Sequence, residues 1–142
     1  MYPNGPYGKS RIVEKDLSYK INGLLYKVHS KLGRYHRERQ YGDEFELMLK
    51  EHNFKYEREK AIVTADRKSN LVDFCIDDRI LVDFKAKPFI TKEDYYQMQR
   101  YLRASNKELG IIANFRQKVI QPKRVLNSGF HVSSERSDKF VG

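Results

Sequence analysis

The sequence predicts a single domain of the α/β class. Apolar residues recur at helical spacing in three segments, and five other segments contain the alternating or continuous apolar runs that are typical of strands. The predicted order is helix, helix, three strands, helix and two strands. A chain of 142 residues is long enough to bury a core in one domain without disulfides or a structural metal.

Two helices are predicted in the first part of the chain. The first spans about residues 16–32, with Asp16 as a candidate N-cap and Gly33 just past its end. Its inward positions are Leu17, Ile21, Leu24, Leu25, Val28 and Leu32. The second spans about residues 37–52, and the residues expected to turn inward are Tyr41, Phe45, Met48 and Leu49.

Three strands should follow, over residues 54–63, 71–76 and 80–86. Residues 64–70 are polar and turn-like. Asp77 and Asp78 stand between the second and third strands, and an Asp pair is a reasonable signal for a hairpin turn.

The last third of the chain should contain one helix and two strands. Helical spacing covers residues 91–105, where Thr91 and Asp94 resemble a capping box with Asp in place of Glu. Residues 109–115 form an apolar run suited to a buried strand, and residues 119–126 are expected to form a further strand. The resulting division is a flexible segment over residues 1–15, a domain over residues 16–127 and a polar tail over residues 128–142.

Composition favours nucleic acid as the partner. The net charge is +9 and the pI is near 9.6, so the protein should attract polyanions. Most of the 10 tyrosines and 8 phenylalanines are expected in the core. The single cysteine, Cys75, should be a small buried apolar residue in a reducing compartment. With no apolar run near membrane length and no signal-peptide core, we expect a soluble, cytoplasmic protein with no membrane partner.

The most informative residues are the charges inside the second and third strand runs. Strand alternation puts Leu81, Asp83 and Lys85 on one face, and it puts Asp73 opposite Val72 and Phe74. A hairpin at Asp77–Asp78 would bring Asp73, Asp83 and Lys85 together. Such a set could bind Mg²⁺ or Mn²⁺ beside an anion and support phosphodiester hydrolysis. The alternative is a structural ion pair at the edge of a sheet.

The order of elements, together with Asp73 and the Asp83-Phe84-Lys85 triplet, resembles the PD-(D/E)xK nuclease superfamily. More narrowly, residues 17–126 are similar to the GxxExxY family: Glu38 and Tyr41 match its naming motif, in which Tyr35 replaces the glycine. Further matching positions are Gln97, the strand Gly110-Ile111-Ile112-Ala113-Asn114-Phe115, and Lys123-Arg124. The resemblance implies a restriction-endonuclease-like core, which is a mixed β-sheet flanked by α-helices.

The resemblance also implies roles for the site residues. Asp73 and Asp83 would bind the metal, with the Phe84 carbonyl as a further ligand, and Lys85 would activate the attacking water and offset charge on the phosphate. Glu38 would reach the metal directly or through water; its alternative role is to complement the dipole of its helix. Gln97 would hydrogen-bond the water or the lysine, unless it is one more solvated helix residue. Tyr41 would pack against the site or in the core.

Basic residues in the second half of the chain are candidates for phosphate contacts, although each could equally be a solvated surface charge. They are Lys87, Lys92, Arg100, Arg103, Lys107, Arg116, Lys118, Lys123 and Arg124.

These observations predict a DNA nuclease that depends on Mg²⁺ or Mn²⁺. The alternatives are a nucleic-acid-binding module of the same fold that does not cleave, and a nuclease that acts on RNA, since a basic surface serves either polymer. A homodimer that embraces the duplex is a further hypothesis.

Overall fold

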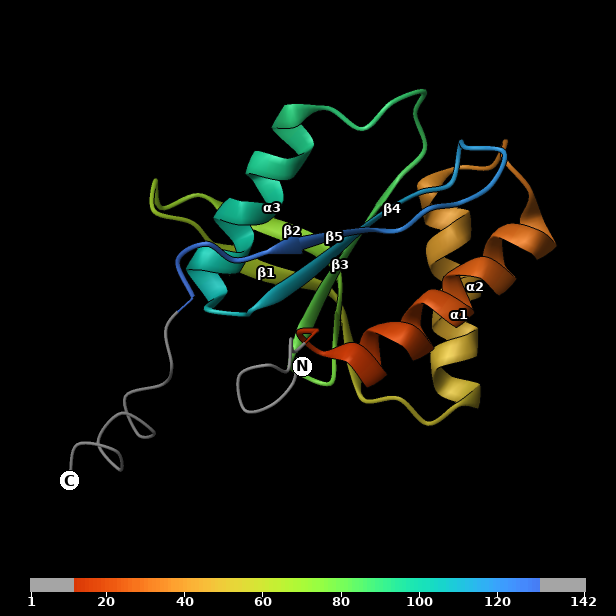
Figure 1. The fold of residues 1–142 in the computed structure, drawn as a ribbon, viewed down its shortest axis with the longest axis horizontal. Coiled ribbons are helices and arrows are strands. Elements are labelled where there is room, and N and C mark those ends of the chain that lie inside the picture. Colours follow the sequence, from red (N-terminus) through yellow and green to blue (C-terminus); the bar gives the residue numbers. More distant parts are fainter. Residues whose placement is uncertain (1–11, 131–142) are drawn as a thin grey trace, which may run out of the picture.

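The computed structural model describes residues 12–130, which form one five-stranded sheet with helices on both faces (Figure 1). The elements in chain order are α1 (Lys15–Leu32), α2 (Glu38–Glu51), β1 (Tyr56–Val63), β2 (Ser69–Ile76), β3 (Ile80–Lys85), α3 (Lys92–Ser105), β4 (Leu109–Asn114) and β5 (Lys123–Leu126). The strand order is β1-β2-β3-β4-β5. β3 and β4 are parallel and the other pairs are antiparallel, so the predicted mixed sheet with flanking helices is confirmed.

Two apolar clusters lie on opposite faces of the sheet. Helices α1 and α2 pack on one face, against side chains that include Phe74, Val82 and Phe84. Helix α3 packs on the other face, against Val72, Leu81 and others. Figure 1 shows α3 apart from the α1–α2 pair, with the sheet between them. The β3-α3-β4 connection explains this arrangement, since parallel neighbours need a crossover and here the crossover contains α3.

Helix and strand types follow the predictions closely. Gly33, with φ 78°, directly follows α1, and Thr91 and Asp94 form the predicted capping box of α3. All residues of β4 are buried, as expected for an apolar run in a central strand. Cys75 is a free thiol and is buried, also as predicted.

The predicted N-cap of α1 is wrong. The N-cap is Glu14, whose φ of 53° is left-handed, and its side chain makes no capping hydrogen bond. The Glu14 carboxylate instead accepts hydrogen bonds from Arg79, and Arg124 bonds the Val13 carbonyl and the Ser18 hydroxyl. The start of α1 is therefore held by tertiary contacts rather than by a local cap.

The last strand is shorter than predicted. It begins at Lys123 rather than near residue 119, and Pro122 stands immediately before it. Proline has no N–H to donate to a strand neighbour, which is consistent with pairing that begins only after it. Ile120 is still buried, so the apolar signal in this segment came from core packing rather than from a strand.

No helix within residues 12–130 is long and apolar enough to cross a membrane. The flexible segment and the tail predicted at the two ends lie largely outside the described residues.

Candidate active site

The β2–β3 hairpin brings Asp73 and Asp83 together. Asp77 and Asp78 both have positive φ, 53° and 56°, and the Arg79 amide donates to the Ile76 carbonyl at 2.9 Å. These values describe a β-turn centred on Asp77 and Asp78, of the type that suits strand twist, which confirms the predicted turn. Because the register pairs Ile76 with Ile80, Arg79 also belongs to the connection. The ladder pairs Phe74 with Val82 and ends there.

Beyond that last pair, a side chain takes the place of a main-chain bond. Oδ2 of Asp73 accepts a hydrogen bond from the Phe84 amide at 2.6 Å. The Asp73 carboxylate is thereby fixed beside the backbone of β3, directly after Asp83. Phe84 itself is buried among the apolar residues under α1 and α2.

The predicted alternation of β2 fails at Asp73. Val72 packs with the α3 cluster and Phe74 with the α1–α2 cluster, although regular alternation would put them on one face. Opposite the break, in β1, Glu59 has φ 54°, a left-handed value that a non-glycine residue rarely adopts. The register is unchanged across the break, with Arg58 opposite Phe74 and Lys60 opposite Val72. Both strands therefore reverse their faces at the position of the candidate ligand.

Asp73 and Asp83, called the acid pair below, differ in their electrostatic surroundings. Burial raises the pKa of Asp73, and the neighbouring Asp83 raises it further, to about 7; the hydrogen bond from the Phe84 amide only partly opposes this. Asp83 is buried and lies 2.9 Å from the Lys85 ammonium. Asp73 makes no ion pair with any residue of the 12–130 range. A nearby cation would relieve this repulsion.

Lys85 is held from three sides. Its Nζ lies 2.9 Å from Asp83 Oδ2, 3.3 Å from Gln97 Oε1 and 4.0 Å from Asp94 Oδ1. Burial by itself would lower the pKa of Lys85. The negative charge of Asp83 and the hydrogen bond between Lys85 and Asp83 outweigh this effect, so the pKa of Lys85 is raised. Lys85 is therefore a charged donor with a defined position between β3 and α3.

Asp94 was not predicted as a site residue. The sequence identifies it only as part of the capping box, where it accepts hydrogen bonds from the Thr91 amide at 2.7 Å and the Thr91 hydroxyl at 3.0 Å. In the fold it also lies 2.6 Å from the Lys87 ammonium. One carboxylate thus joins the start of α3 to both lysines that follow Asp83. No local signal in the sequence could have indicated this second role.

Glu38 lies at the first position of α2, on the other side of the acid pair. Burial raises the pKa of its carboxyl, Lys85 opposes this, and Asp83 raises it again. The Ala86 amide also stabilises the carboxylate. Glu38 and Asp73 line one hollow of about 370 Å³, together with Arg58 and Glu59. Glu38 is thus close enough to the pair to interact with both Asp83 and Lys85.

Tyr41 lies in the core. Its ring stacks on Phe115 with centroids 4.1 Å apart, and its hydroxyl donates to the Gly33 carbonyl at 2.5 Å and accepts from the His36 amide at 3.2 Å. These contacts tie the α1–α2 connection to β4.

The predicted phosphate-contacting residues fall into two groups. Several are engaged within the fold: Lys87 with Asp94, Lys107 with Asp78, Arg103 with the Ser128 hydroxyl, Arg116 with the Ala86 carbonyl, and Arg124 with Ser18 and Val13. The others are exposed and make no ion pair in the described part of the chain: Lys92, Arg100, Lys118 and Lys123.

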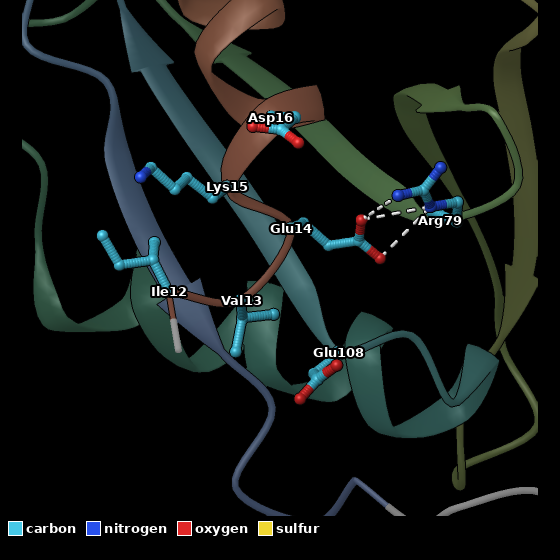
Figure 2. Close-up of a pocket in the computed structure, with 7 residues that line it drawn as sticks. All are labelled: Ile12, Val13, Glu14, Lys15, Asp16, Arg79 and Glu108. Carbon is cyan, nitrogen blue, oxygen red and sulfur yellow. Dashed lines mark hydrogen bonds and ion pairs between the residues drawn. The ribbon is translucent and has the colours of Figure 1, made fainter. Parts of the chain in front are cut away.

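Another hollow, of about 520 Å³, lies at the start of α1 and shares no lining residue with the hollow at Asp73. Figure 2 shows the Glu14 carboxylate facing Arg79 from the turn between β2 and β3, with Glu108 nearby. The Glu14–Arg79 pair is satisfied within the fold.

The chain is similar to a known family and to a solved structure. A family model described as the PD-(D/E)XK nuclease superfamily matches residues 15–125. The crystal structure of an alkaline exonuclease from Laribacter hongkongensis aligns with 92% of this chain and 77% of that chain, at 10% identity and a TM-score of 0.45. Among curated proteins, none matches the sequence. The matched range spans Asp73, Asp83, Lys85 and Gln97.

Proposed function

Because the chain belongs to the PD-(D/E)XK nuclease superfamily, we propose that it hydrolyses phosphodiester bonds in DNA with the help of Mg²⁺ or Mn²⁺. The observation that carries this proposal is the Asp73 carboxylate, which is held beside Asp83 without a cation of its own. Lys85 stands next to the pair at a fixed position. Asp73, Asp83 and Lys85 therefore lie together, and this arrangement supports the proposal.

The donor set fits such a metal. Among residues 12–130, no three His, Cys, Asp or Glu side chains gather closely enough to enclose an ion. Mg²⁺ is commonly held by only one or two carboxylates together with water and substrate phosphate, so Asp73 and Asp83 meet this requirement. A bound divalent ion would polarise the phosphate and lower the pKa of a bound water.

The other side chains would act on the water and on the phosphate. Lys85 would donate to the attacking water or to a phosphate oxygen and stabilise the negative charge that develops there. Gln97 and Asp94 would hold the lysine in position through their contacts at 3.3 Å and 4.0 Å. Glu38 would contribute a further acceptor from α2. We also propose the narrower GxxExxY assignment, on the positions of Glu38 and Tyr41.

The test is cleavage of supercoiled plasmid and of labelled single-stranded, duplex and branched DNA, with RNA of matching sequence. Each is incubated with Mg²⁺, Mn²⁺ or EDTA. We expect metal-dependent cleavage by the wild type and a loss of at least about 100-fold in Lys85→Ala. Lys55→Ala, an exposed lysine at the start of β1, is the matched control.

The outcomes separate the alternatives. Cleavage of RNA alone would replace DNA as the substrate. Salt-sensitive binding without cleavage by either protein would favour a binding module that keeps the acids but does not hydrolyse DNA. Circular dichroism of Lys85→Ala establishes that the loss is not unfolding.

We also propose that two copies of the chain act on one duplex, since a domain of this size has little room for separate specificity elements. Light scattering with and without DNA tests this. A monomer under both conditions would contradict it.

A further inference from the structure

Two arginines from distant parts of the chain meet beside the candidate active site. Arg34 belongs to the connection between α1 and α2, and Arg116 belongs to the turn that follows β4. Nε of Arg34 donates to the main-chain carbonyl of Arg116 at 2.9 Å. In Figure 1 the light-blue turn after β4 lies against the orange connection between α1 and α2.

An exposed aromatic ring aligns both guanidinium groups. Tyr35 is 74% exposed, and its ring centre lies 5.2 Å from the Arg34 guanidinium carbon and 5.7 Å from that of Arg116. Guanidinium groups stack readily on aromatic faces, because their hydration is weak and their charge is spread over a plane. The two cations are therefore held close together despite their mutual repulsion.

Neither arginine is neutralised by an acid of the described part of the chain. Within residues 12–130 neither guanidinium makes an ion pair. Nη2 of Arg116 donates to the Ala86 carbonyl at 3.1 Å, whereas its Nε is buried and has no hydrogen-bond partner among the described residues. A buried donor without a partner is unfavourable unless a ligand or water completes it.

The arginine pair is joined to the catalytic strand. Ala86 directly follows Lys85, and the Phe115 amide donates to the Lys85 carbonyl at 2.9 Å. The Ala86 amide also stabilises the Glu38 carboxylate. A group bound by Arg34 and Arg116 would thus lie next to the residues that are proposed to carry out hydrolysis.

We infer that Arg34, Tyr35 and Arg116 form a phosphate-binding subsite for the nucleic-acid strand, beside the phosphate that is cleaved. This inference rests on the proposed function, because it takes the Lys85 site as the place of cleavage. The planar guanidinium fork matches the oxygens of a phosphate. The bound phosphate is either an internal diester or the terminal phosphate of a strand, and both have the same recognition chemistry.

The test measures binding without metal, so that it does not depend on cleavage. Fluorescence anisotropy in EDTA compares the wild type with Arg34→Gln/Arg116→Gln on linear single strands that carry a 5′-phosphate or a 5′-hydroxyl. Competition by an unlabelled circular single strand supplies a substrate without ends. Lys55→Gln/Arg67→Gln is the matched control. Both residues are exposed and neither belongs to the proposed site, and the two substitutions remove the same charge as the double variant does.

We expect the double variant to bind at least about tenfold more weakly than the control variant. A plot of log K against log salt concentration should be less steep for the double variant, by about 0.7 for each phosphate contact that is lost on a single strand. A loss of affinity that is confined to the 5′-phosphorylated strand identifies the bound group as a terminal phosphate. An equal loss of affinity for the circular strand identifies it as an internal diester. Either result supports the subsite.

Equal weakening in the double variant and in the control would overturn the inference, because net charge alone would then account for it. If the double variant does not fold, Arg34→Gln and Tyr35→Leu are tested singly, with Tyr35→Phe as the variant that keeps the ring. Unchanged affinity in both Arg34→Gln and Tyr35→Leu would also overturn it. Failure of the proposed function looks different: the subsite variant would still weaken binding, but no variant would cleave.

Discussion

Two clusters in this protein have the same ingredients, two carboxylates and one cation, but differ in how these are connected. In the first, Arg58 lies 2.8 Å from Asp43 and 3.0 Å from Glu46, so both acids share the guanidinium. In the second, Lys85 lies 2.9 Å from Asp83, whereas Asp73 accepts a hydrogen bond from the Phe84 amide and makes no ion pair within residues 12–130. The first cluster is balanced and the second is not.

The pKa directions follow this difference. Hydrogen bonds from Tyr56 and Arg58 lower the pKa of Glu46, which burial only partly opposes. Burial and the charge of Asp83 raise the pKa of Asp73. The comparison teaches that counting charges does not separate a structural ion pair from a candidate metal site. What separates them is whether each acid contacts the cation: Arg58 contacts both of its acids, whereas Lys85 pairs with Asp83 and not with Asp73.

Removing the charge of Asp73 should have the largest effect. Asp73→Asn keeps an oxygen that can accept from the Phe84 amide but removes the repulsion with Asp83. We expect cleavage to fall by at least about 100-fold, while the metal-free protein gains on the order of 1 to 3 kcal/mol in free energy of unfolding. Plasmid cleavage and thermal unfolding in EDTA measure the two effects.

Added Mn²⁺ should raise the melting temperature of the wild type and leave that of Asp73→Asn unchanged. A variant that is less stable than the wild type in EDTA would contradict the unbalanced pair.

The pH dependence of stability should differ between these two proteins. The pKa of Asp73 rises from an ordinary value of 3.8 to about 7 on folding, so between these values the folded state binds more protons than the unfolded state. The contribution of Asp73 to the free energy of unfolding therefore declines as pH rises from about 4 to about 7, and it no longer changes at higher pH. Urea unfolding in EDTA from pH 4 to pH 8 should show the stability advantage of Asp73→Asn growing over this range. An advantage that is independent of pH would rule out this cause.

Breaking the balanced cluster should affect stability rather than chemistry. In Arg58→Met the acids Asp43 and Glu46 lose their shared partner, and the contact of the guanidinium with the Phe74 ring, 5.5 Å from its centre, is lost. We expect a loss of about 1 to 2 kcal/mol in free energy of unfolding, with cleavage reduced by only a few fold. Lys60→Met, which breaks the exposed pair with Glu57, is the control and should cost less. A severe loss of cleavage in a folded Arg58→Met protein would count against its structural role.

The smallest effect is expected at Gln97. Its contact with Lys85 is long, at 3.3 Å, and Asp83 holds the same ammonium at 2.9 Å. Gln97→Leu should therefore slow cleavage by about tenfold or less and leave stability within about 0.5 kcal/mol. Single-turnover cleavage at saturating protein measures the chemical step. A loss as large as that of Lys85→Ala would show that Gln97 contacts the reacting groups itself.

Much of the fold could be predicted because its signals are local. Helices α1, α2 and α3 were found within a residue or two from apolar spacing, and the Asp77–Asp78 turn from the preference of Asp for turns. The start of α1 could not be predicted, because Arg79 from the β2–β3 turn and Arg124 from β5 hold it. Pro122 did indicate that β5 begins late, but the apolar residues before it favoured the prediction of a longer strand.

For the site, the sequence by itself determined which residues are proposed to carry the chemistry: Asp73, Asp83 and Lys85 are charges in apolar strands, and that pattern is visible without a structure. Only the tertiary structure decided how they are connected. The reversal of faces at Asp73 depends on Glu59 in the neighbouring strand, and the second role of Asp94 depends on where α3 lies. The approach of Arg34 to Arg116 joins two loops far apart in the chain. Periodicity reports the face of a residue within one element, whereas these contacts arise between elements, and no local pattern encodes them.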